Sequence, residues 1–154
     1  MKKRGILFIV IGILIILSPL YFIFKPKTCE TAGCFEQAAS ECKKARILVD
    51  EAGKSILEYA IKEKDNDNCV LKIEVKEISA DYSQSTKDKF EGKSMLCSIP
   101  SNEFSRMKFE DMGGNLDYCN GQLKEAMYDA VVKKLYNLVV KDMATVLDEI
   151  ERKL

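Results

Sequence analysis

A run of twenty residues without a charged side chain, residues 5–24, constrains this chain more than any other feature. The run begins GILFIVIGILIIL and is rich in isoleucine, leucine and phenylalanine. As an α-helix it would be about 30 Å long, which is the thickness of the hydrocarbon layer of a bilayer. A helix satisfies its own backbone hydrogen bonds, so such a segment is stable in lipid. The sequence therefore predicts a transmembrane helix over residues 5–24.

The charges around this run predict its orientation. Residues 1–4 carry three basic side chains and no acidic one, which favours a cytoplasmic N-terminus. Two lysines that follow the run weaken this bias without reversing it. We therefore expect a single-pass anchor in the cell membrane, a linker over residues 25–32 and an extracytoplasmic domain over residues 33–154.

A cleaved signal peptide and a prepilin-like leader are two alternatives to a retained anchor. A signal peptide has a shorter apolar core and a cleavage site of small residues, whereas this run continues through SPLYFIF without an Ala-x-Ala pattern. A prepilin-like leader would explain why Lys3-Arg4-Gly5 directly precedes the apolar run. Basic residues at that place are also what the orientation of any anchor requires. The retained anchor is therefore favoured.

Composition narrows the chemistry of the remainder. The whole chain has 24 basic and 24 acidic residues, and residues 1–24 contain three of the basic ones and none of the acidic ones. The other 130 residues therefore hold 21 basic and 24 acidic side chains, a net charge of −3, which excludes the basic surface of a nucleic-acid-binding protein. Histidine is absent, which excludes Ser-His and Cys-His nucleophile pairs and His-based metal sites. We expect no cofactor, no metal and no catalytic residues.

The cysteines predict a disulfide framework. An even number of cysteines in an exported domain of modest size is typical of such a framework, and their spacing contains no C-x2-C motif of a zinc or redox site. Sequence alone leaves the pairing open, and buried free thiols are the alternative. One pair can be argued against, because eight residues of a shared helix would separate two cysteines by about 12 Å, beyond the roughly 7 Å limit for a bridge. That pair is Cys34 and Cys42, and the full set is Cys29, Cys34, Cys42, Cys69, Cys97 and Cys119.

Hydrophobic periodicity predicts an α+β fold. Blocks of helix, strands and helix, without alternation, favour an antiparallel sheet over a parallel one. We expect about four antiparallel strands, with the long C-terminal helix packed on one face of the sheet. The predicted elements are a short helix over residues 33–44, strands over 45–50, 55–63, 69–76 and 93–99, a polar loop over 79–92, an irregular segment over 101–114 and a helix over 121–152.

The C-terminal helix is longer than a compact domain needs. Its 32 residues would span about 48 Å, whereas a domain of this size has a diameter of roughly 36 Å. Either the helix bends near residues 139–142 or its last turns project. Its late apolar residues follow a 4-3-4 spacing typical of a coiled-coil seam, which suggests association with a second copy or with a protein partner; the alternative is that the stripe covers the sheet or a loop. These residues are Val139, Met143, Val146 and Ile150.

Three short segments carry a resemblance to a protein family. Residues 34–42 read CFEQAASEC, a C-F-x2-A-x3-C motif, and residues 92–100 read GKSMLCSIP, a G-K-S-M-x-C-x-I-P motif. Residues 118–123, YCNGQL, accompany them. Together they resemble an uncharacterised family of small membrane-anchored or exported proteins from small-genome archaea. The resemblance implies an exported location and scaffold roles for the motif residues, and it implies no catalytic residue.

Three hypotheses of function remain. The first is a membrane-anchored extracytoplasmic module for binding or envelope assembly, without catalytic activity. The second is a carrier of a small molecule or peptide, with a cavity between sheet and long helix that would include Tyr59 or Tyr82. The third is an enzyme, a thiol-disulfide catalyst or a carboxylate acid/base catalyst, for which the sequence offers no constellation. The first is favoured and the third is disfavoured.

Overall fold

A computed structural model describes residues 26–152, without the side chains of residues 141–142, 144–148 and 151. The predicted transmembrane helix over residues 5–24 lies outside the described residues. Within residues 26–152, no helix is both long enough and apolar enough to cross a membrane. The elements are β1 (Lys27–Cys29), α2 (Ala32–Ser40), β2 (Ala45–Asp50), β3 (Ser55–Asp65), β4 (Asn68–Ile78), α3 (Gln84–Phe90), β5 (Ser94–Pro100), α4 (Ser101–Phe104), the 3-10 turns η1 (Phe109–Asp111) and η2 (Leu116–Tyr118), β6 (Cys119–Asn120) and α5 (Gln122–Glu151).

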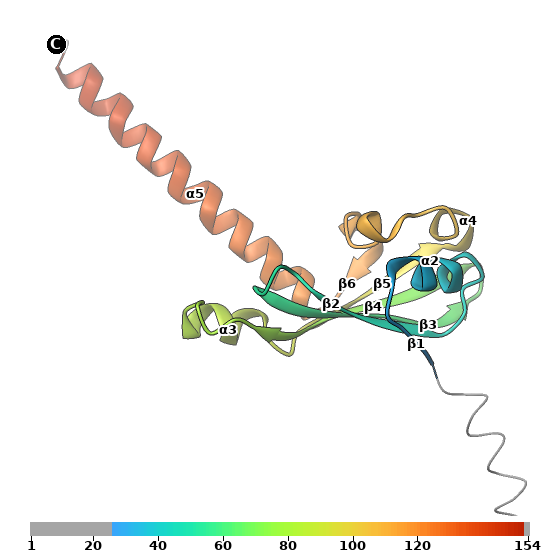
Figure 1. The fold of residues 1–154 in the computed structure, drawn as a ribbon. Coiled ribbons are helices and arrows are strands. Elements are labelled where there is room, and N and C mark those ends of the chain that lie inside the picture. The colour runs from blue at the N-terminus through green and yellow to red at the C-terminus, as the bar shows by residue number, and fades with distance from the viewer. Residues whose placement is uncertain (1–25, 153–154) are drawn as a thin grey trace, which may run out of the picture.

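The centre of the fold is one sheet of six strands in the order β1-β2-β3-β4-β5-β6 (Figure 1). Strand β1 runs parallel to β2, and every other neighbouring pair is antiparallel. The predicted α+β class is thus confirmed, and the expectation of about four strands is corrected to six. The two additional strands have three and two residues, too few for an alternating pattern to reveal them.

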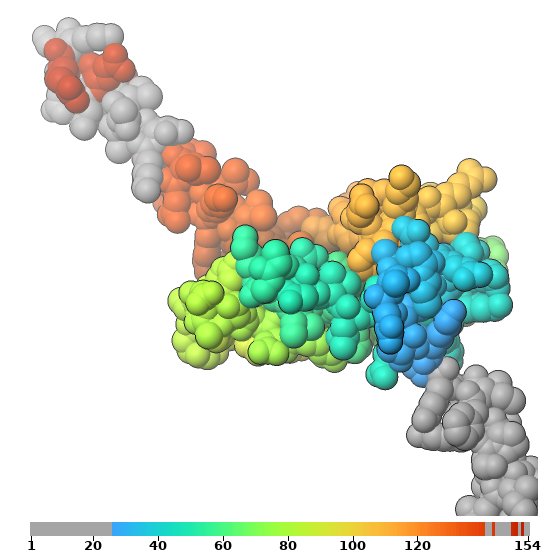
Figure 2. Space-filling model, viewed as in Figure 1, coloured from blue at the N-terminus to red at the C-terminus, as the bar shows by residue number. Residues whose placement is uncertain are grey.

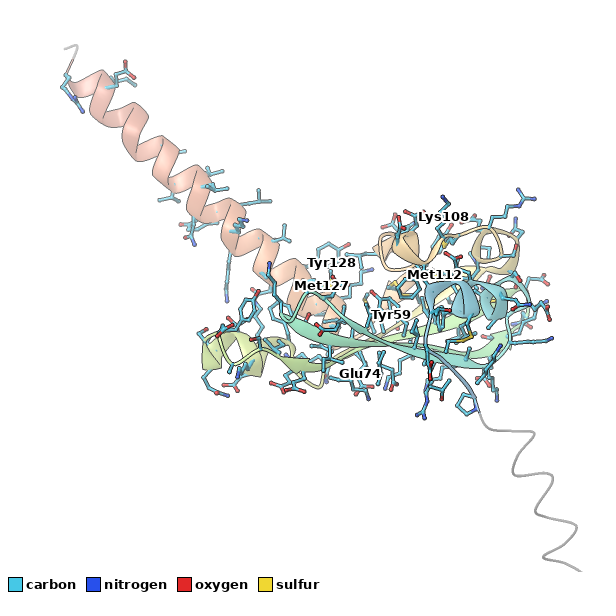
Figure 3. All side chains as sticks on the ribbon, viewed as in Figure 1. Tyr59, Glu74, Lys108, Met112, Met127 and Tyr128 are labelled. Carbon is cyan, nitrogen blue, oxygen red and sulfur yellow. A yellow bond between two sulfur atoms is a disulfide. The ribbon has the colours of Figure 1, made fainter. Side chains whose placement is uncertain are left out.

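The two faces of the sheet differ in the way that the alternation of side chains predicts. On β4, Ile73 and Val75 are buried on one face, whereas Glu74 lies on the opposite face, 2.6 Å from Lys72 Nζ. Figure 3 shows Glu74 on the other side of the sheet from Tyr59. The inner face therefore holds the core, and the outer face carries charged side chains.

One half of the inner face is covered by α2, α4 and η1. The rings of Phe35 and Phe104 are fully buried there, and Phe35 makes an edge-to-face contact with Phe109 at 5.6 Å. Helix α2 ends at Ser40, earlier than the predicted limit of residue 44, because the backbone at Cys42 turns into the left-handed region with φ +52°. This half of the sheet is the closed part of the core.

Three disulfides bind the small elements to the sheet, which confirms the predicted framework. The two cysteines that were argued not to pair with each other, Cys34 and Cys42, bond to different partners. The bridges join β1 to α2, the end of α2 to β4, and β5 to β6. They are Cys29–Cys34, Cys42–Cys69 and Cys97–Cys119.

Helix α3 occupies part of the segment predicted as a polar loop. Ser83 caps its N-terminus, because the hydroxyl oxygen accepts a hydrogen bond from the backbone N–H of Thr86 at 3.3 Å. Phe90 is the one large apolar residue of this helix. A seven-residue helix with one apolar position has no 3.6-residue period, so the polar composition led to the wrong prediction.

Helix α5 corrects the expectation of a helix packed along the sheet. Leu123 and Ala126, in its first turns, are buried, whereas Val132, Leu135 and Tyr136 are all more than half exposed. Figures 1 and 2 show the later turns of the helix extending away from the domain. Of the two alternatives, a bend or a projection, the structure shows the projection: α5 is one continuous helix of 30 residues, about 45 Å long.

Candidate ligand-binding site

An apolar pocket opens on the second half of the inner sheet face, between α3 and the base of α5. Its volume is about 320 Å³, at the lower end of the range of about 300–1,000 Å³ that is usual for ligand sites. Strands β3, β4 and β5 form its floor, and the two helices form its sides. The lining residues are Lys54, Ser55, Leu57, Tyr59, Ile73, Val75, Ile78, Tyr82, Thr86, Phe90, Met95, Gly113, Leu123 and Met127.

The floor of the pocket follows from the alternation of side chains on the sheet. Ile73 and Val75 on β4 and Met95 on β5 are buried, and all three point to the inner face. The pairing of β3 with β4 shifts register between Ile56 and Leu57, and such bulges bend a strand. The floor is therefore curved, apolar and fixed by main-chain hydrogen bonds.

The sides of the pocket are held together by an ion pair. Lys89 on α3 and Asp129 on α5 approach to 2.5 Å between Nζ and Oδ2, and Lys133 lies 3.2 Å from the same oxygen. Hydrogen bonds from Lys89 and then Lys133 lower the pKa of the Asp129 carboxyl. Asp129 is exposed to solvent and Lys89 is partly so; the pair therefore joins the two helices at this point but adds little to the stability of the fold.

Tyr59 connects the pocket to the closed half of the core. Its ring contacts Phe109 at 5.0 Å, and a Cβ atom on Gly113 would lie 3.7 Å from its hydroxyl oxygen. Burial, and to a smaller extent the charge of Glu51, raises the pKa of the Tyr59 hydroxyl. The hydroxyl therefore keeps its proton at neutral pH and can donate a hydrogen bond within an otherwise apolar site.

The mouth of the pocket carries a positive charge. Lys54 is exposed there, next to Ser55 and to Tyr82, which is 41% exposed. Within residues 26–152, no ion pair uses the ammonium group of Lys54. The lining contains no carboxylate and no thiol. The arrangement can hold an apolar group inside and a polar or anionic group at the entrance.

The structure separates the two groups of residues that the sequence singled out. All six cysteines are bonded in pairs, so no thiol is available for chemistry. Val139, Met143 and Ile150 are exposed on the projecting part of α5, and the side chain of Val146 is not among those described. These residues lie on the far part of a helix of which only the first turns border the pocket.

Both tyrosines named for a cavity between sheet and helix, Tyr59 and Tyr82, line the pocket. Sequence reasoning missed Phe90, Leu123 and Met127 as pocket residues. For Phe90 the available signal was the serine that caps α3, since serine is favoured at the N-cap of a helix. For the other two, helical periodicity indicated an apolar stripe without indicating which turns meet the sheet.

Comparisons with known proteins give no information on the function of this pocket. The chain matches no protein-family profile, and no curated protein or solved structure is significantly similar to it. The family resemblance carried by the cysteine motifs therefore stays a prediction. Among the described residues, no cluster of histidine, cysteine, aspartate or glutamate could hold a metal ion.

Proposed function

We propose that this protein is a membrane-anchored extracytoplasmic binding module that holds a small apolar or amphipathic ligand between its sheet and its helices. The observation that carries the proposal is the pocket of about 320 Å³, whose buried floor is apolar and whose mouth has one lysine. Ligand sites commonly combine an apolar lining with a few polar groups that orient the ligand. The anchor rests on the uncharged run over residues 5–24. Three disulfides support an extracytoplasmic location, because such bonds persist in oxidising compartments.

The pocket composition favours binding over catalysis. The titratable groups in its lining are Lys54, Tyr59 and Tyr82, and burial raises the pKa of the Tyr59 hydroxyl, away from the range useful for a base at neutral pH. No carboxylate in the lining could exchange a proton with a substrate. A ligand with an aliphatic body and an anionic end would place the body on Ile73 and Val75 and the charge near Lys54. We therefore combine the first two hypotheses: the protein is a membrane-anchored binding module, and the pocket is the place where it carries a small ligand.

Octanoate and octanol are suitable probes, because they share an aliphatic chain and differ in charge. The experiment uses the full chain in lipid nanodiscs with isotope-labelled methionine methyl groups. Met95 and Met127 line the pocket, whereas Met143 lies on the projecting part of α5 and serves as an internal control. We expect the first two methyl signals to shift saturably with octanoate while that of Met143 stays in place. Octanol should bind more weakly, and a Lys54→Gln variant should lose the difference between the two probes.

A pair of glycine substitutions provides the matched control. A side chain at Gly113 would point at Ile73 and Tyr59, so Gly113→Leu should fill the pocket and abolish the shifts. Gly33 in α2 is exposed and has no atom near the position of an added Cβ, so Gly33→Leu should leave binding unchanged. Methionine shifts that fail to saturate, or that persist in Gly113→Leu, would overturn the proposed function.

A further inference from the structure

Helix α5 carries an exposed apolar stripe that the pocket does not use. We define the α5 seam as the residues of this stripe whose exposure is between 46% and 60%: Tyr128, Val132, Leu135, Val139, Met143 and Ile150. The seam begins in the second turn and runs to the last turn of the helix. It covers 22 residue steps, about 33 Å of helix.

The α5 seam repeats with a period of eleven residues. Tyr128, Val139 and Ile150 are eleven apart, and so are Val132 and Met143. Eleven residues are close to three turns of an α-helix, so residues at this spacing point in nearly the same direction. The stripe is therefore straight along a helix without strong supercoiling. The seam is also longer than the 4-3-4 pattern of the sequence. Three residues of that pattern, Val139, Met143 and Ile150, form the end of the seam.

The domain itself does not cover the α5 seam. At about 100° per residue, the mean direction of Leu123 and Met127 differs from that of the seam by roughly 150°. Those two residues are the ones that meet the sheet and line the pocket. The seam thus lies on the side of the helix that faces away from the docking side, and the exposure of Tyr128 and Val132 agrees with this.

The composition of α5 indicates that the projecting part needs a partner. β-Branched residues disfavour an isolated helix, and its sequence has Val-Val at 131–132 and again at 139–140. Most helical stability in proteins comes from packing of an apolar face. A helix of this composition is therefore stabilised chiefly by burial of its apolar side.

The exposed area matches one protein interface. The six residues of the α5 seam are between 46% and 60% exposed. With about 200 Å² as the surface of one large side chain, they leave on the order of 650 Å² uncovered. Monomeric proteins seldom expose apolar patches larger than about 300–600 Å². Stable complexes bury about 800 Å² on each partner, so a partner of about the same extent is sufficient.

Charge favours a protein over a lipid surface as this partner. Helix α5 contains four lysines and six acidic residues, a net charge of −2. Interfacial helices that bind anionic lipids are instead rich in lysine and arginine on their polar face. An anionic bilayer would therefore repel α5.

From these observations we infer that the α5 seam pairs with the α5 seam of a second copy of this chain. A periodic seam is complementary to itself, because its apolar layers recur at the same spacing on both helices. Symmetric pairing of identical surfaces is also the commonest form of oligomer. The pairing places two pockets in one assembly and leaves both open, because the seam and the pocket use opposite sides of α5.

Two variants with the same charge change test the pairing in the full chain. Val139→Glu puts a charge in the centre of the seam, whereas Asn137→Glu puts it on the polar side of the helix, about 160° away. Sedimentation in mild detergent should show a dimer for the wild type. Burial of an unpaired charge should raise the dissociation constant of Val139→Glu by about tenfold or more, with Asn137→Glu unchanged.

A photo-crosslinking residue at position 139 identifies the occupant directly. We expect a covalent dimer of the chain, and none from the same residue at position 137. Monomeric wild type at high micromolar concentration, equal effects of the two glutamate variants, or crosslinks to lipid alone would each overturn the inference. Circular dichroism and a non-reducing disulfide map of each variant verify that the fold is intact, because neither position contacts the core.

Discussion

Gly121, between β6 and α5, is the position at which a single methyl group should be most damaging. Its backbone has φ +124°, a region that residues with a Cβ rarely adopt. A Cβ there would lie 2.8 Å from the carbonyl oxygen of Ser94 and 3.1 Å from Cα of Met95. Both contacts are with the backbone of β5, which cannot rotate away as a side chain can. Gly121→Ala therefore strains the junction that sets the direction of α5.

The cost can be worked from two contributions. A residue with a side chain in a sparsely populated backbone region costs about 1–3 kcal/mol, and overpacking against fixed atoms costs about 1–3 kcal/mol more. We expect Gly121→Ala to lower the free energy of unfolding by about 2–6 kcal/mol, a large part of the roughly 5–15 kcal/mol of an ordinary domain. Hydrogen exchange at the β5–β6 contact and in the first turns of α5 should increase with it.

Urea unfolding of the full chain, followed by circular dichroism with the disulfides intact, measures this loss. Gly33→Ala is the matched control, because Gly33 is helical and an added methyl group meets no atom within 4 Å. The control should leave the stability unchanged or raise it by up to about 0.5 kcal/mol, because alanine favours helix more than glycine does and Gly33 lies in the first turn of α2. A loss below about 1 kcal/mol in Gly121→Ala would refute the reasoning from backbone strain and close approach.

Other predictions concern the disulfides and the contact between the helices. Loop entropy ranks the bridges: removal of Cys42–Cys69, with a sequence separation of 27, should cost about 3.5 kcal/mol, and removal of Cys29–Cys34, with a separation of 5, about 2 kcal/mol. Equal losses in chemical denaturation of the two double-alanine variants would contradict this ranking. The lowered pKa of Asp129 means that its contribution to stability is present above the unfolded-state pKa and is lost as pH falls through the folded-state pKa. A carboxyl NMR titration should show a higher pKa of Asp129 in Lys89→Gln, because Lys89 is its main partner, and no change after that substitution would show that the contact does not form. Glu51→Gln should lower the pKa of Tyr59 while leaving it above its usual value, because burial is the larger cause; a spectroscopic titration of the phenol checks this.

The sequence predicted those parts of the fold in which the alternation of apolar and polar residues shows which side chains are buried. Strands β4 and β5 follow their alternation, and the buried residues Ile73, Val75 and Met95 are those that it places on one face. Sequence patterns missed strands β1 and β6 because the strands are too short for a period. A disulfide joins β6 to β5 and another joins β1 to α2, and no local pattern encodes either pairing.

The pocket was predictable only in outline. Tyr59 and Tyr82 could be named for a cavity, since an aromatic residue with a polar end is typical of such sites. Its shape depends on the length over which α5 stays on the sheet. That length depends on the junction at Gly121 and on the change of the apolar side of the helix between Met127 and Tyr128. The apolar residues before and after this change have the same period of 3.6 residues. The period therefore does not indicate where the helix leaves the sheet.

Helix α5 extends much farther beyond the pocket than along it, when both lengths are measured from Gly121. Met127 lies about 9 Å along the helix from Gly121, and Glu151 about 45 Å. A tilt that displaces the tip by about 5 Å therefore moves the pocket wall by about 1 Å, a fivefold reduction. A displacement of the distal turns would therefore reach the pocket wall on a scale about fivefold smaller.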